Sequence, residues 1–171
     1  MSIACFETKY HYLFWRPASA ITLADTDGNA ATAPDPAWTP VVPTPNHPEY
    51  PAAHGCVFGG MGEALRSFYG TRRLKFSFDT TVAGISAEGM VHDYASIQEL
   101  TDDSLARIWG GMHYRTSVEH GRTLGEQTAA WIVSPSLKFV MNERTLYFLI
   151  GIVLAKVVPD SMKPQSLSGI R

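Results

Sequence analysis

The chain has 171 residues, enough for one domain with a sizeable core, and its 45% hydrophobic content is typical of a folded protein. Its formal charge of −2 argues against binding nucleic acid or a membrane surface through bulk charge, so an anion site would need local clustering of cations. The most apolar run, Leu146 to Ala155, is shorter than the roughly 20 residues that span a bilayer, and no signal peptide is visible.

Residues 2–15 are predicted to form a helix, because apolar side chains recur there at steps of three and four. Pro17 is expected to end it, since the residue before a proline is pushed out of the helical region. Lys9 and Arg16 lie seven positions apart, about two turns, and therefore on the same side of this helix and its exit. Trp15 and Pro17 flank Arg16, which indicates a partly buried guanidinium that needs an anionic partner.

A long connection follows over residues 18–50. Eight of the eleven prolines lie from Pro17 to Pro51. Proline-rich loops of this length in compact domains are usually functional or wrapped against the fold.

Residues 51–69 are predicted to form the second helix, with Gly70 as its C-cap. Its four glycines indicate close approach of another helix or of a ligand. His54 lies at the start of this helix, where unpaired backbone N–H groups favour an oxyanion. A single histidine at a helix start is more often a capping or packing residue, so the functional interpretation depends on the cations in other segments.

Alternating side chains at residues 74–78 predict a short strand. Ser96 and Glu99 fit a capping box that opens a third helix carrying Arg107, and two glycines end that helix. A second capping box at Thr116 is expected to open a fourth helix that runs to about residue 134. The glycine turn between these helices can bring Arg107 and His113 to one point, although a histidine between helices is often only structural.

The two cysteines, Cys5 and Cys56, do not make a disulfide framework and are interpreted as buried free thiols. Residues 134–171 carry no usable motif, so we divide the chain into a helical domain over 2–133 and a divergent segment over 134–171.

Three motifs now stand in order: Lys9 with Arg16-Pro17, then Pro51-Ala52-Ala53-His54, then Ala106-Arg107 with His113. They resemble the signature of the vanadium-dependent haloperoxidase and type 2 phosphatidic acid phosphatase superfamily, K-x6-R-P, P-S-G-H and S-R-x5-H-x3-D. The surrounding residues look more like the haloperoxidase-like branch than the lipid phosphatases.

The resemblance implies an all-α helical bundle with a long proline-rich loop, one short hairpin at most, and a bound tetrahedral oxyanion. Lys9, Arg16 and Arg107, with a backbone N–H near Ala53, would hold the oxygens of vanadate or phosphate. His113 would ligate vanadium in a haloperoxidase or become phosphorylated in a phosphatase. His54 would be the acid–base group acting on bound peroxide or on the leaving group.

The chain departs from the family signature at several positions. Ala52 stands in place of the family serine, which removes a hydrogen-bond donor to the oxyanion, and Ala53 replaces the glycine but keeps its N–H. Ser117 replaces the aspartate that orients the apical histidine, for which Glu119 or Glu126 are candidate substitutes. Weakened rather than abolished oxyanion binding is expected.

Three functions remain open at this point. The first is a peroxidase that uses vanadate, hydrogen peroxide and halide, with a small organic substrate as acceptor. The second is a soluble acid phosphatase working through a phosphohistidine, and the third is an inactive truncated member. His47 stands seven residues before His54, a position at which the resemblance implies phenylalanine in chloroperoxidases and histidine in bromoperoxidases. Bromide preference is therefore expected. The family's chains are usually longer, so this one resembles a C-terminal fragment that lacks N-terminal helices, unless a homo-oligomer completes its core.

Overall fold

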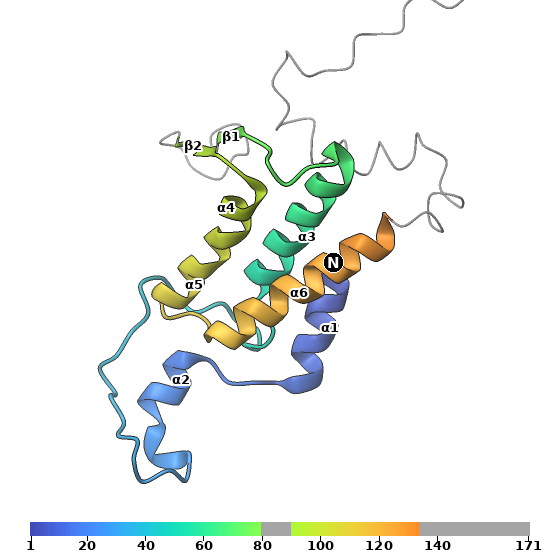
Figure 1. Cartoon of the computed structure of the whole chain (residues 1–171). Coiled ribbons are helices and arrows are strands. Elements are labelled where there is room, and N and C mark those ends of the chain that lie inside the picture. Colours follow the sequence, from blue (N-terminus) through green and yellow to red (C-terminus); the bar gives the residue numbers. More distant parts are fainter. Residues whose placement is uncertain (80–89, 134–171) are drawn as a thin grey trace, which may run out of the picture.

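The computed structural model describes residues 1–79 and 90–133, and most of this part is helical (Figure 1). The elements in chain order are α1 (Ser2–Tyr12), α2 (Pro17–Thr22), η1 (Ala24–Thr26), α3 (Ala53–Tyr69), β1 (Phe76–Asp79), β2 (Val91–Tyr94), α4 (Ile97–Asp102), η2 (Asp103–Leu105), α5 (Ala106–Trp109) and α6 (Arg115–Ile132). The strands form a two-stranded antiparallel hairpin in which Phe76 pairs with Tyr94. The predicted helical bundle with one short hairpin is therefore confirmed.

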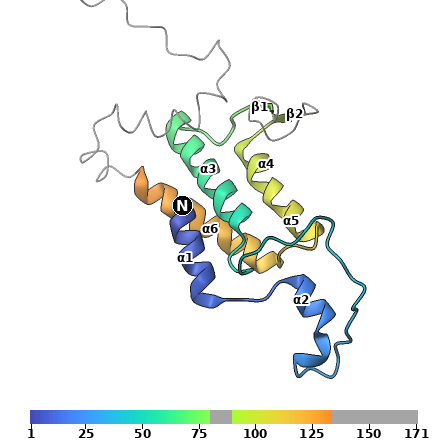
Figure 2. The same cartoon turned by 180° about the vertical axis from the view of Figure 1, so that it is seen from behind.

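The long helices α3 and α6 pack across each other and form the centre of the bundle (Figures 1 and 2). Glycines make this crossing close, because a Cβ added at Gly55 would lie 2.5 Å from the carbonyl oxygen of Val118. A Cβ at Gly59 would fall on the backbone of Arg122, and one at Gly125 on the backbone of Cys56. The prediction that glycines in this helix mark a close helix approach is confirmed.

A hydrophobic cluster fixes the opposite side of α3. Leu65 packs there with Tyr94, Ile97 and Leu100, all of them buried. The α4 helix starts as predicted, since Ser96 Oγ accepts a hydrogen bond from the N–H of Glu99 at 3.2 Å. This cluster holds α4 and the hairpin against α3 and leaves the N-terminal end of α3 for the candidate site.

A disulfide between Cys5 and Cys56 joins α1 to α3, with their Cα atoms 6.4 Å apart. The interpretation of both cysteines as free thiols is therefore wrong. Both side chains are buried where α1 packs on α3, and a pairing between residues 51 positions apart depends on that contact. The number and spacing of two cysteines carry no such information.

Several helix boundaries differ from the sequence-based expectation. The first helix ends at Tyr12 because Leu13 adopts a left-handed conformation, φ 49°, and its N–H bonds to the carbonyl of Lys9. Pro17 does not end that helix but begins α2, where its fixed φ and missing N–H are tolerated. The predicted third helix is divided into α4, η2 and α5.

The second predicted capping box is also wrong. The N-cap of α6 is Tyr114, without a side-chain cap, and the Ser117 hydroxyl bonds elsewhere.

Among the described helices, none is long and apolar enough to cross a membrane. The divergent segment expected over 134–171 lies outside the described residues.

Candidate oxyanion site

Lys9 is fully buried at the inner face of α1. Its Nζ donates to the carbonyl oxygens of Pro48 and Glu49, each at 2.9 Å. Burial, followed by repulsion from Arg16, lowers the pKa of Lys9 to about 8, although Glu49 opposes the shift. An ammonium has three donors, so one remains for a further acceptor.

Arg16 connects the proline-rich loop to the turn after α5. It donates to the carbonyl oxygens of His47 and Met112, both at 3.0 Å, and its other contacts are His47 Nδ1 at 3.0 Å and His113 Nε2 at 3.2 Å. With its Nε on His47 at 3.2 Å, all five donors have a protein partner. An anion that binds Arg16 must therefore take over one of these contacts.

Glu49 is completely buried and holds His113 from behind. Its Oε1 accepts from His113 Nδ1 at 2.8 Å and from the N–H of Tyr114 at 3.0 Å, while Oε2 accepts from Ser117 Oγ at 2.6 Å. Burial alone would raise the pKa of Glu49, but these three bonds bring it below its usual value. The group is therefore a carboxylate at neutral pH.

The carboxylate decides the tautomer of His113. Since a carboxylate only accepts hydrogen bonds, Nδ1 of His113 carries the proton and Nε2 keeps its lone pair. Burial is the largest influence on the pKa of His113 and lowers it, against the opposing effect of the hydrogen bond that Nδ1–H donates to Glu49. His113 is thus a neutral imidazole whose Nε2 faces the guanidinium of Arg16.

The expectation that Glu119 or Glu126 orients His113 is wrong. Glu49 fills the role, and Ser117, at the position of the family aspartate, supports Glu49 through its hydroxyl. The sequence offered one signal that was not used: Glu49 stands five residues before His54, inside the motif region itself. Its distance of 64 positions from His113 concealed the contact.

Arg107 lies beside His113 because the N–H groups of Met112 and His113 both bond to its carbonyl oxygen, at 3.0 and 3.2 Å. The predicted glycine turn is therefore present, with Gly111 at φ 73°. Within residues 1–79 and 90–133, Arg107 Nε is a buried side-chain nitrogen without a hydrogen-bond partner. Such a group is costly unless a ligand pairs with it.

Ala53 and His54 are the first two residues of α3, as the motif predicts. The N–H of the preceding Ala52 donates to the carbonyl of Ser117 at 2.9 Å, which fixes this helix start against α6. The His54 side chain is partly exposed. Partial desolvation of the imidazole nevertheless lowers the pKa of His54 to about 4, and the positive charge of Arg107 lowers it further. His54 is neutral above that pH and lies near Arg107 and Lys9, whose charges contribute to the shift.

His47 binds Arg16 rather than an open cavity. Its Nδ1 lies 3.0 Å from an Arg16 nitrogen and its ring meets Phe6 edge-on, with centroids 5.2 Å apart. Burial lowers the pKa of His47, and the contact of its Nδ1 with the carbonyl oxygen of Pro48, at 3.1 Å, opposes that shift. Its assignment as a halide-tuning residue stays a prediction.

These side chains fit an oxyanion. Three cations, Lys9, Arg16 and Arg107, converge with Glu49 as the acidic group hydrogen-bonded to His113. Among the residues described, no group of three His, Cys, Asp or Glu side chains could hold a bare metal ion. A vanadate or phosphate anion needs cationic donors and one imidazole nitrogen, and the cluster offers both.

The family is established by comparison with known proteins. The family model of the VCPO second helical-bundle domain matches residues 1–142, and the chain belongs to this family of vanadium haloperoxidase-like helical bundles. No curated protein matches the chain.

Solved structures of bacterial enzymes share the fold. A vanadium-dependent iodoperoxidase is 28% identical, with a TM-score of 0.61 over 77% of this chain and 29% of its own. A vanadium-dependent chloroperoxidase in its holo form is 22% identical, with a TM-score of 0.59 over 81% of this chain and 32% of its own. Its apo form gives 23% identity and a TM-score of 0.59, over 81% of this chain and 33% of its own. The chain therefore spans about a third of the length of these relatives.

Proposed function

We propose that this chain carries the vanadate site of a vanadium-dependent haloperoxidase, which oxidises halide with hydrogen peroxide. One observation carries the proposal: Glu49 fixes His113 as the Nδ1–H tautomer, and the unprotonated Nε2 faces the buried guanidinium of Arg16. The family of the chain and its likeness to a bacterial iodoperoxidase support the same function.

Each side chain has a role that follows from its contacts. Lys9 offers its third ammonium proton, Arg107 its unpaired Nε–H, and the first turn of α3 its free N–H groups, Ala53 included, to the oxygens of the anion. Arg16 must turn one donor from His113 Nε2 to the anion, which frees that nitrogen to ligate vanadium. Vanadate, when bound, would activate hydrogen peroxide toward attack by halide.

His54 is the group that moves protons. It is neutral above about pH 4, chiefly because of burial, and it would become a stronger proton acceptor once a bound anion offsets the added repulsion from Arg107. Its place on the first turn of α3 keeps it next to the N–H groups that would hold the anion. His47, which binds Arg16, would set halide choice, with bromide as the predicted substrate.

An acid phosphatase is the second candidate, because the same observation favours it. A neutral imidazole with an oriented Nε2 is also the nucleophile that a phosphohistidine mechanism needs. An oxyanion pocket of cations does not distinguish vanadate from phosphate.

The experiment measures vanadate binding, bromide-dependent oxidation of a phenol dye by peroxide, and hydrolysis of an aryl phosphate, all on the same sample. We expect vanadate binding with bromide turnover, and we expect His113→Ala to abolish turnover. His11→Ala, at an exposed histidine on α1, is the matched control and should leave turnover unchanged.

Other outcomes would overturn the proposal. Hydrolysis that vanadate inhibits, without halide oxidation, assigns the chain to the phosphatases. Turnover that survives His113→Ala removes the whole site assignment. A folded sample silent in both assays indicates an inactive member, or one that needs further helices or a second copy to complete it.

A further inference from the structure

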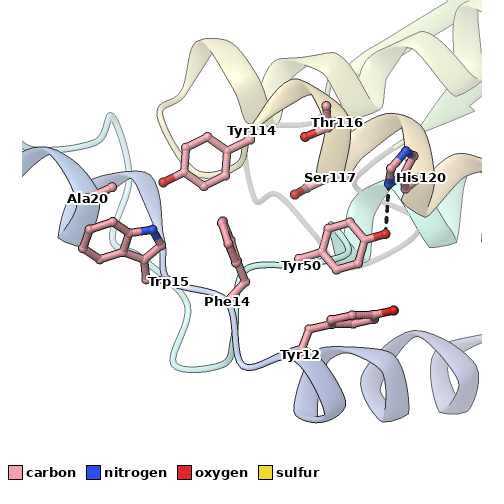
Figure 3. A pocket seen from close by; sticks show the side chains of 9 residues that line it. All are labelled: Tyr12, Phe14, Trp15, Ala20, Tyr50, Tyr114, Thr116, Ser117 and His120. Atoms are coloured by element: carbon pink, nitrogen blue, oxygen red, sulfur yellow. Dashed lines mark hydrogen bonds between the residues drawn. The ribbon is translucent and has the colours of Figure 1, made fainter. Parts of the chain in front are cut away.

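A cavity lined by none of the cations of the oxyanion cluster lies around Tyr50, next to Glu49 in the sequence (Figure 3). It measures about 660 Å³ and opens between the exit of α1, the start of α2 and the first turns of α6. Cavities of this size hold small organic molecules. None of the functions discussed above uses it.

Aromatic rings make up most of the wall. Phe14 and Tyr114 meet edge to face with centroids 5.8 Å apart, and Tyr12 and Tyr50 do so at 5.3 Å. Trp15 closes the side toward α2, as Figure 3 shows. Among the described residues that line the cavity, none is a lysine, arginine, aspartate or glutamate. The wall therefore suits an uncharged, flat, apolar ligand.

A few polar groups border this apolar space. The Tyr50 hydroxyl and His120 Nδ1 are hydrogen-bonded at 2.9 Å and satisfy each other. The hydroxyl of Thr116 and the indole N–H of Trp15 have no hydrogen bond to any other residue in the described part of the chain. They are available to a ligand hydroxyl, as donors or, for Thr116, as an acceptor.

We propose that this cavity binds a neutral aromatic alcohol of the phenol or naphthol class. Its ring packs against the aromatic wall, and its hydroxyl bonds to that of Thr116. An organic cation would also suit aromatic faces, but it gains most when a carboxylate balances its charge, and none lines this cavity. Uncharged walls favour the neutral ligand.

The site is separate from the oxyanion cluster. Ser117 and Tyr114 line the cavity, and both hold the carboxylate of Glu49 on the Nδ1 side of His113. The oxyanion would bind on the opposite side, at Nε2. An aromatic ligand and an oxyanion can therefore bind together, and the proposal does not depend on the catalysed reaction.

The test is calorimetric titration of the full chain with 2-naphthol. We expect saturable one-to-one binding that sulfate, an anion chosen for the cationic cluster, does not displace. Ala20→Phe places a ring in the cavity and should weaken binding at least tenfold, as expected for a blocked pocket. Ala130→Phe, at an exposed position on α6, is the control and should bind as the wild type does.

A second variant keeps the test independent of folding defects. Thr116→Val removes the hydroxyl but keeps the shape, so it should weaken 2-naphthol severalfold and leave naphthalene binding unchanged. Absence of saturable binding in folded wild type, equal binding by folded Ala20→Phe, or tighter binding of choline than of 2-naphthol would each overturn the proposal.

Discussion

At the scale of single residues, the key feature is that the carboxylate of Glu49 orients His113, a role that the family signature gives to an aspartate at position 117. The family signature has an aspartate at the position of Ser117, where this chain has only a hydroxyl. Glu49 takes over the hydrogen bond to His113, and Ser117 becomes its donor. The orientation of the imidazole is kept although the residue that provides it has changed.

An exchange of these two side chains tests this interpretation. Glu49→Gln should weaken vanadate binding by roughly 10- to 100-fold, because a neutral amide orients His113 but no longer stabilises charge on it. Adding Ser117→Asp to that variant should restore part of the affinity, since it supplies a carboxylate at the family position.

Equilibrium vanadate binding of both variants measures the effect, with Glu119→Gln on the exposed face of α6 as the control. If Glu49→Gln bound vanadate as the wild type does, Glu49 would be only a structural carboxylate.

Lys9 gives the site a pH dependence. Its pKa of about 8 lies below the usual lysine value because the group is buried and next to Arg16. Protonation is thus disfavoured in the folded state, so the free energy of unfolding falls as pH falls from 10.5 to about 8, and Lys9 has no such effect above 10.5. Anion binding has the opposite requirement, because it needs the charged form.

We expect the affinity for sulfate, which does not titrate in this range, to fall as pH rises through about 8 or somewhat higher, since the bound anion raises the pKa of Lys9. Lys9→Met should bind sulfate weakly at every pH and lose most of this dependence. Titration calorimetry from about pH 6 to about pH 10 measures both. An unchanged pH profile in Lys9→Met would assign the dependence to another group.

At the scale of the elements, the crossing of α3 and α6 decides where the site can form. The close approach brings the N-terminal end of α3, with His54, to the first turns of α6, where Ser117 accepts from the N–H of Ala52. Glycines allow this approach, and a larger side chain at the contact would separate the helices.

Two adjacent glycines provide a matched comparison. A Cβ at Gly59 would meet the backbone of Arg122, whereas one at Gly60 would meet only the flexible side chain of Met1. We expect Gly59→Ala to lower the free energy of unfolding by about 2 kcal/mol or more. Gly60→Ala should stay within about 1 kcal/mol of wild type, since alanine improves helix propensity. Urea unfolding of the two variants is the measurement, and equal losses would contradict the close helix contact at Gly59.

At the scale of the whole molecule, α1 reaches the bundle through few contacts, although it supplies Lys9. Its outer face leaves large side chains exposed, Ile3 at 87% and Tyr10 at 57%. The disulfide from Cys5 to Cys56 attaches this helix to α3, four residues before Lys9 and two after His54. One covalent bond therefore links the helix that carries Lys9 to the helix that carries His54.

Breaking that bond should cost both stability and binding. Closing a loop between residues 51 positions apart is worth about 4 kcal/mol in the chain-entropy model. We expect a reducing agent, or Cys5→Ser with Cys56→Ser, to lower the free energy of unfolding by 2–4 kcal/mol, about the usual range, and to weaken sulfate binding with it. Unfolding with and without reductant measures this, and the double variant, which should not respond to reductant, is the control.

The sequence by itself determined the positions of the main helices and the order and spacing of the three motifs, because periodicity and motif spacing are local properties. The helical-bundle class followed from the family resemblance that those motifs carry. Gly70 as a C-cap and Ser96 as an N-cap were readable for the same reason. Local signals also set the limits of that prediction, since Leu13 ends α1 without a glycine or a proline.

Only the tertiary structure decided which distant residues touch. The carboxylate of Glu49 on His113, the disulfide of Cys5 with Cys56, and the aromatic cavity between α1, α2 and α6 each join segments tens of residues apart. The sequence shows which side chains could form hydrogen bonds or a disulfide. The crossing of α3 and α6 at their glycines determines which of them come close enough to do so. The site is therefore a product of packing, built on motifs that the sequence already displays.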